Sequence, residues 1–155
     1  MYVGWEDGPH KVSEEVERMC AAESALNNVS TYHAFADRIA QNGKKLHSLL
    51  DDFRDRGIRV VGYGSPAKAT TLCYALGIDG TMIEYIVDDS PLKQGLYMPG
   101  THIPIKAPAT IYTDKPGCCL ILAWNFADSI IKNNQKFIKN GGVFINPVPE
   151  PRILS

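Results

Sequence analysis

The sequence predicts an α/β fold, a three-layer domain with a mostly parallel sheet of about four to five strands, preceded by two helices. Two observations carry this prediction. Residues 1–56 hold two apolar patterns with helical spacing, and residues 57–155 alternate short β-branched runs with helical patterns. Alternating strands and helices are typical of right-handed βαβ units with parallel strands. The chain is therefore divided into a helical lead-in (1–56) and an α/β domain (57–155).

The first lead-in helix is expected to begin after Ser13, which is suited to cap it because acidic residues follow in the first turn. Its apolar stripe consists of Val12, Val16, Met19, Cys20 and Leu26. A second helix is expected from Ser30, a further cap candidate, to Gly57. Its apolar stripe consists of Tyr32, Phe35, Ile39, Leu46, Leu49 and Phe53.

The second helix would be about 40 Å long at 1.5 Å per residue. That length exceeds what one small sheet covers, so we expect part of the helix to pack on something beyond this domain. Gly43 lies in its middle, and because glycine is a poor helix former, a kink or break is expected to be permitted there.

The α/β domain is expected to contain four strands, at 58–63, 82–87, 118–123 and 143–146, and two helices, at 66–76 and 127–139. A long segment punctuated by prolines and glycines separates the second strand from the third. The tail contains Pro147, Pro149 and Pro151, and we expect it not to continue the sheet because proline cannot donate to a strand ladder.

Composition excludes several classes of protein. The chain has 155 residues, 45% hydrophobic and 21% charged, which suits one globular domain. A net charge of −1 gives no general attraction to nucleic acid or to anionic membranes. We find no membrane-spanning run and no signal peptide, so we expect a cytoplasmic protein with no nucleic-acid or membrane partner. The four cysteines lack metal-ligand spacing, and we expect no metal site.

The segment 62–67 matches the pattern G-x-G-x-x-[GA] directly after a predicted strand and before a predicted helix. Gly62 permits a tight exit from the strand, and Gly64 permits close approach of a ligand. Pro66 suits the start of a helix, whose free amides favour an anion, and Lys68 adds a positive charge. This context predicts a Rossmann-like phosphate-binding loop. The alternative is a turn that needs glycines for its own backbone, with Lys68 facing solvent.

The loop after the third predicted strand is expected to flank the same crevice if the first strand is central. It contains Trp124, suited to stack on a base or sugar, and Asn125, suited to hydrogen-bond a ligand. The alternatives are that Trp124 packs in the core and that Asn125 caps the next helix, and the two roles of Asn125 are compatible.

Two further candidates follow the second strand. Asp88 and Asp89 end the second strand, where a dinucleotide fold places the acid that binds a ribose hydroxyl, and Asp88 is the candidate. Capping or turn formation before Pro91 is an equally good interpretation. His102 lies in a loop expected near the crevice, without an acid–base partner in sequence. We find no G-x-S-x-G, H-E-x-x-H or Walker A pattern, and we assign no catalytic residue.

Five segments, at 62–68, 87–95, 99–105, 124–125 and 147–151, occur in an order that resembles one family over nearly the whole chain. It is the carboxy-terminal domain of the S-adenosylmethionine-dependent C-methyltransferases that act on nucleotide-linked deoxysugars. The resemblance implies a Rossmann-like domain that closes over the nucleotide sugar. It implies that a full-length enzyme has a zinc-binding domain and then an S-adenosylmethionine-binding methyltransferase domain, upstream of this one.

The resemblance also implies methylation of a carbon next to a keto group, through an enolate formed by a base that lies upstream near a Gly-Gly-Ser-Leu-Arg segment. The chain begins near the end of that segment. We therefore expect it to bind neither zinc nor S-adenosylmethionine and to lack methyltransferase activity by itself. The expected partners are a nucleotide sugar and the amino-terminal methyltransferase domain of the same protein, on which the lead-in helices, with Tyr2 and Trp5, would dock.

The predicted binding residues share a place in the loops at the expected crevice. They are Gly62, Tyr63, Gly64, Ser65, Pro66, Lys68, Asp88, His102, Trp124 and Asn125. Two other functions stay open at this point. The chain is alternatively a stand-alone NAD- or nucleotide-binding regulatory module, or an interaction domain that keeps the fold without a ligand.

Overall fold

The computed structural model of the chain describes residues 3–5 and 7–154. The chain divides into two compact units, residues 1–37 and residues 38–155. The boundary falls inside helix α2 (Val29–Asp55), so residues 38–55 of this helix belong to the unit that contains the sheet. The sequence division after residue 56 stays a prediction.

The larger unit is built on one sheet of six strands in the order β3-β2-β1-β4-β5-β6. The strands are β1 (Val60–Tyr63), β2 (Ile86–Val87), β3 (Ile105–Lys106), β4 (Cys118–Ile121), β5 (Val143–Asn146) and β6 (Arg152–Leu154). The pairs from β3 to β5 are parallel, and β6 runs antiparallel to β5. The predicted α/β class with a mostly parallel sheet is therefore confirmed, and β1 lies between β2 and β4.

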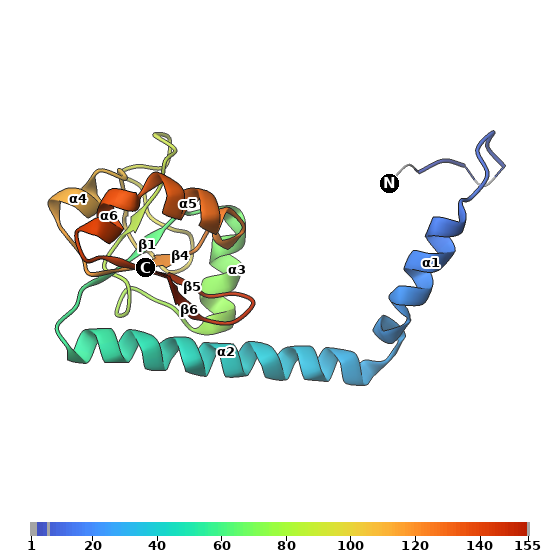
Figure 1. Cartoon of the computed structure of the whole chain (residues 1–155), viewed down its shortest axis with the longest axis horizontal. Helices are drawn as coiled ribbons and strands as arrows, with labels where there is room; N and C mark the ends of the chain where they lie inside the picture. The colour runs from blue at the N-terminus through green and yellow to red at the C-terminus, as the bar shows by residue number, and fades with distance from the viewer. Residues whose placement is uncertain (1–2, 6, 155) are drawn as a thin grey trace. The chain divides into compact units, whose positions relative to one another are not determined.

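Helices cover both faces of the sheet. They are α3 (Ala67–Leu76), α4 (Thr110–Thr113), α5 (Ala127–Asn133) and α6 (Gln135–Lys139), together with residues 38–55 of α2. Successive side chains of a strand point to opposite faces. One face therefore packs Val60 and Leu120 against α2 and α3, and the other packs Val61 and Ile121 against α4, α5 and α6. The three layers can be followed in Figure 1.

Two strands are present that the sequence did not predict. β6 pairs Arg152 with Asn146 and Leu154 with Phe144, so the expectation that the tail cannot continue the sheet is wrong. Pairing starts directly after Pro151 and at an edge of the sheet, where proline is tolerated. β3 and the single-turn helix α4 were missed because runs of two and four residues give no periodic signal.

The tail between β5 and β6 is also attached to α2. The Asn42 side-chain amide donates a hydrogen bond of 2.5 Å to the carbonyl of Pro149. Lys45 and Glu150 form an exposed ion pair at 3.6 Å, which contributes at most about 1 kcal/mol because water screens it. The carboxy-terminal strand is thus held by the sheet and by a helix at once.

The predicted helices differ from the observed ones in two places. α2 passes through Gly43 without a break. The α-carbon and carbonyl oxygen of Leu76 in α3 would lie 3.8 Å from a β-carbon at this position, so the small residue lets the two helices approach closely. The expected helix 127–139 is interrupted at Asn134, which separates α5 from α6.

The smaller unit contains α1 (Glu14–Ala22), the 3₁₀ helix η1 (Ser24–Asn27) and the start of α2. Within its described part, 3–5 and 7–37, no residue is buried. Ser13 precedes α1 without a side-chain cap. Asn28, not Ser30, caps α2, because its side-chain oxygen accepts a hydrogen bond of 3.0 Å from the Ser30 amide. No described helix is long and apolar enough to cross a membrane.

Candidate binding crevice at the carboxyl ends of the central strands

The candidate site lies where the strand order reverses. From β1 the chain continues on one side to β2 and β3, and β4 and β5 lie on the other side. The loops after β1 and β4 therefore diverge and leave a crevice, the place where ligands of doubly wound sheets bind. A pocket of about 310 Å³ occupies it. Its polar and small lining residues come from three loops and α5: Tyr63, Gly64, Pro66, Asp88, Asp89, Lys93, Ala123, Ser129 and Asn133.

The glycines of the loop after β1 are required by packing inside the protein. A β-carbon on Gly62 would lie 2.9 Å from the Ile86 side chain of β2. Gly64 has a φ of +84°, and its β-carbon would lie 2.6 Å from that of Ala123. Gly64 therefore lets the loops after β1 and β4 touch. This observation supports the alternative that the turn needs glycines for its own backbone, and a ligand role for the two glycines stays a prediction.

Asp88 binds the protein rather than the open pocket. Its Oδ2 accepts hydrogen bonds from the Ser65 amide at 2.6 Å, the Ser65 hydroxyl at 2.7 Å and Lys93 Nζ at 3.2 Å. Its Oδ1 accepts a bond of 2.9 Å from the Ser90 amide. Burial alone would raise the pKa of Asp88, but these hydrogen bonds outweigh burial and hold the pKa below its ordinary value. Asp88 therefore ties the loop after β2 to the loop after β1.

Lys68 forms a second cluster with the loop after β4. Its ammonium donates a short hydrogen bond to the side-chain oxygen of Asn125. The same ammonium lies 4.5 Å from the ring centroid of Trp124 and 5.9 Å from that of Phe126, distances at which a cation is attracted to an aromatic face. Trp124 is half-buried and packs against the core face that carries α3. The structure thus brings three predicted residues together beside the pocket.

Tyr63 connects the pocket to a buried polar network. Its hydroxyl donates to Asp89 at 3.1 Å, and Asn134 donates to it at 3.4 Å. Tyr112 donates to the Asn134 side-chain oxygen at 2.8 Å. Burial raises the pKa of Tyr63 to about 12, so its hydroxyl keeps the proton that it donates at neutral pH.

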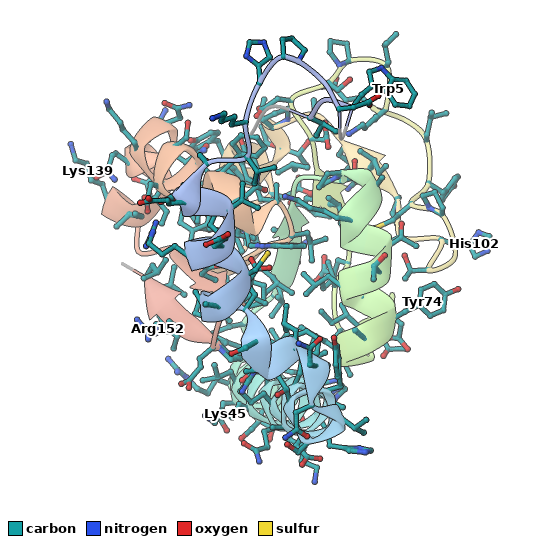
Figure 2. All side chains as sticks on the ribbon, turned by 90° about the vertical axis from the view of Figure 1, so that its right-hand side faces the viewer. Trp5, Lys45, Tyr74, His102, Lys139 and Arg152 are labelled. Carbon is teal, nitrogen blue, oxygen red and sulfur yellow. The ribbon has the colours of Figure 1, made fainter. Side chains whose placement is uncertain are left out.

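His102 is placed elsewhere. β3 runs parallel to β2, so the chain must return to the amino-terminal edge of the sheet before β3 begins, and His102 precedes β3 by three residues. It is exposed and does not line the pocket. Figure 2 shows its side chain projecting outward. The expectation that this histidine lies near the crevice fails because the two-residue strand β3 could not be read from the sequence.

Four polar or charged residues of the pocket lie outside the predicted set: Asp89, Lys93, Ser129 and Asn133. For two of them a signal was available, because Ser129 and Asn133 are four residues apart and so share a helix face beside the buried Ile130. Lys93 gave no such signal, since its role depends on the fold of the loop that brings it to Asp88.

The described residues were searched for catalytic and metal-binding groups at the crevice. Among the described residues that line it, the Tyr63 hydroxyl donates to Asp89, and we find no serine, threonine or cysteine side chain hydrogen-bonded to a His, Asp or Glu. No described group of three His, Cys, Asp or Glu residues could hold a metal ion. Cys73, Cys118 and Cys119 are buried, and burial raises the pKa of Cys73 to about 11, so this thiol stays protonated and unreactive.

Comparison with known proteins gives two matches. A family model described as the C-methyltransferase C-terminal domain matches residues 1–149. The C-methyltransferase NovU of Streptomyces niveus is 38% identical over 148 residues, which cover 94% of this chain and 35% of NovU. The chain thus spans about a third of the length of this curated relative.

Proposed function

The chain belongs to the C-methyltransferase C-terminal domain family, and we propose from this premise that it is the substrate-side domain of an S-adenosylmethionine-dependent C-methyltransferase. The proposed substrate is a nucleotide-linked deoxy keto-sugar. The observation that carries the proposal is the pocket at the switch point between β1 and β4. This is the place where a sheet of this order binds nucleotides and related ligands.

The size of the pocket supports binding of one part of such a substrate. Small-molecule sites span about 300–1,000 Å³, and this pocket, at about 310 Å³, fits a single sugar or nucleoside unit. Lys68 stands next to it, because its ammonium lies 5.9 Å from the ring of Phe126, a pocket residue. A sugar or nucleoside in the pocket would therefore place its diphosphate within reach of a positive charge.

The domain's own contribution is to bind and orient the substrate. Tyr63, which lines the crevice, stays protonated at neutral pH. We propose that the base and the methyl donor belong to the remainder of the enzyme, where S-adenosylmethionine supplies the methyl group.

Titration of the chain with nucleoside diphosphate hexoses tests the proposal. We expect saturable binding of UDP-glucose or dTDP-glucose by calorimetry. We expect Lys68→Ala to weaken it about tenfold or more, because a charge-assisted hydrogen bond to phosphate is worth about 1.5–3 kcal/mol. Lys139→Ala is the control, since it removes the same charge from an exposed position on α6.

Indistinguishable binding by wild type and Lys68→Ala would contradict the role of Lys68. Binding of NADH without any binding of nucleotide sugars would favour the alternative, a stand-alone NAD- or nucleotide-binding regulatory module. A third outcome, no thermal response to any of these ligands, would favour an interaction domain, because a ligand at 100 times its dissociation constant adds about 2.7 kcal/mol of stability.

We further propose that the smaller unit docks on the methyltransferase domain of the same protein. Apolar side chains form one stripe along α1 and the segment that precedes it, where Val12 is 77%, Val16 46% and Met19 39% exposed. Trp5 is 88% exposed, and Tyr2 lies outside the described residues. About two thirds of NovU lies outside the region that matches this chain. We propose that the corresponding methyltransferase domain is the partner that covers this apolar stripe.

An association experiment tests the docking proposal. We expect the chain to bind the part of NovU that it does not match, in analytical ultracentrifugation, and we expect Met19→Lys to weaken binding at least tenfold. The physical reason is that burying a methionine is worth about 1.5–3 kcal/mol. Ala21→Lys adds the same charge to the opposite face of α1 and is expected to leave binding unchanged. Equal losses in the two variants would contradict a specific apolar interface.

A further inference from the structure

We propose that Asp89, and not Asp88, is the carboxylate of the crevice that binds the substrate, and that it accepts hydrogen bonds from hydroxyl groups of a sugar or ribose. This inference rests on the proposed function, and it names the residue and the chemical group that the pocket recognises. The two aspartates are neighbours in sequence and both line the pocket. They differ in how many of their acceptor sites the protein itself already uses.

Asp88 has little capacity left for a ligand. A carboxylate offers about four acceptor sites, and the oxygens of Asp88 accept four hydrogen bonds, from the Ser65 amide and hydroxyl, Lys93 and the Ser90 amide. It is also buried, with 7% of its surface exposed. A ribose hydroxyl could bind Asp88 only by displacing one of these internal donors, which would lose one bond for each bond made.

Asp89, in contrast, keeps most of its hydrogen-bond acceptor sites free for a ligand. It is exposed, and within the described part of the chain it accepts one hydrogen bond, from the hydroxyl of Tyr63. About three of its four acceptor sites are therefore available. The Tyr63 hydroxyl is itself held by Asn134, which accepts a bond from Tyr112. This buried chain of hydrogen bonds fixes the proton donor that orients Asp89 at the rim of the pocket, so the free lone pairs are pre-organised.

The charges around Asp89 select a neutral hydroxyl over an anion. The side chains of acidic or basic type that line the pocket are Asp88, Asp89 and Lys93, and Lys93 is already paired with Asp88 at 3.2 Å. A phosphate placed against Asp89 would therefore meet uncompensated negative charge. Ser129 and Asn133 also line the pocket and can bond further hydroxyls.

The decisive variant is Asp89→Asn in the whole chain, titrated calorimetrically with UDP-glucose, dTDP-glucose and UDP. Asparagine keeps an oxygen for the Tyr63 hydroxyl, so we expect the thermal midpoint to stay unchanged. We expect the dissociation constant for the hexose-bearing ligands to rise about 10- to 100-fold, since hydrogen bonds to a charged acceptor are lost. Asp55→Asn is the control, because it makes the same change in charge at an exposed position at the end of α2.

The three ligands locate the hydroxyls. If Asp89→Asn loses affinity for UDP-glucose and dTDP-glucose but not for UDP, Asp89 recognises the hexose. A loss that extends to UDP supports recognition of the ribose. Equal dissociation constants for wild type and Asp89→Asn would overturn this inference and leave the proposed function standing. If the wild type binds none of the three ligands, the proposed function fails and this inference fails with it.

Discussion

Replacing Gly64 with alanine is expected to lower the free energy of unfolding by about 3 kcal/mol or more. Two costs add at this position. The φ of +84° lies in the left-handed region, where a residue with a β-carbon is less stable by about 1–2 kcal/mol. The new β-carbon would also lie 2.6 Å from the β-carbon of Ala123, a rigid neighbour, and overpacking of this kind costs about 1–3 kcal/mol.

Urea unfolding at neutral pH measures this loss, and Gly57→Ala separates the two costs. Gly57 has a φ of +68°, and no heavy atom lies within 4 Å of a β-carbon built on it. We therefore expect Gly57→Ala to lose only the backbone part, about 1–2 kcal/mol. Equal losses of unfolding free energy in Gly64→Ala and Gly57→Ala would contradict this explanation. They would show that the contact between the loops after β1 and β4 does not require glycine at position 64.

Replacing Asp88 with alanine is the second large expected effect, a loss of about 2–4 kcal/mol at pH 7. The substitution leaves the amides of Ser65 and Ser90 without their acceptor and Lys93 without its counter-ion. Asp55→Ala, at an exposed position, should change stability by less than about 0.5 kcal/mol. If Asp88→Ala also lowered the free energy of unfolding by less than about 0.5 kcal/mol, water would be replacing these hydrogen bonds at no cost in stability.

The effect of Asp88 should also depend on pH, with a defined sign. The pKa of Asp88 in the folded protein is lowered, whereas in the unfolded chain it is about 3.9. The unfolded state therefore binds a proton first on acidification, and the contribution of Asp88 is complete above about pH 4 and lost below it. Urea unfolding at several pH values should show the wild type and Asp88→Ala converging in acid. A constant difference between them down to pH 2 would contradict this linkage.

Sequence patterns were sufficient for the parts of the fold that recur over many residues. The alternation of strands and helices predicted the sheet. The condition set for the crevice, that the first strand be central, is met because β1 lies between β2 and β4. Short elements escaped prediction, because β3 has two residues and α4 has four, fewer than any periodicity needs. His102 was predicted to lie near the crevice because β3, which follows it in the chain, was not predicted.

The candidate site could be located from the sequence but not resolved into roles. Asp88 and Asp89 are chemically identical neighbours, and which one faces the protein depends on contacts with Ser65 and Lys93 that only the folded chain creates. Lys68 was selected for its charge, whereas its contact with the ring of Trp124 depends on two loops that are distant in sequence. Patterns thus identify the loops that flank the candidate crevice, and tertiary contacts decide which polar atoms in it remain free of internal hydrogen bonds.

The antiparallel strand β6 has a practical meaning for the design of expressed fragments. The family match ends at residue 149, whereas β6 begins at Arg152. A fragment trimmed to the matched region would therefore leave β5 as an open edge, and its Phe144 and Ile145, fully buried in the whole chain, would lose their covering strand. Open apolar edges are templates for intermolecular pairing and aggregation. By pairing with β5, residues 152–154 are thus expected to protect this edge of the sheet from self-association.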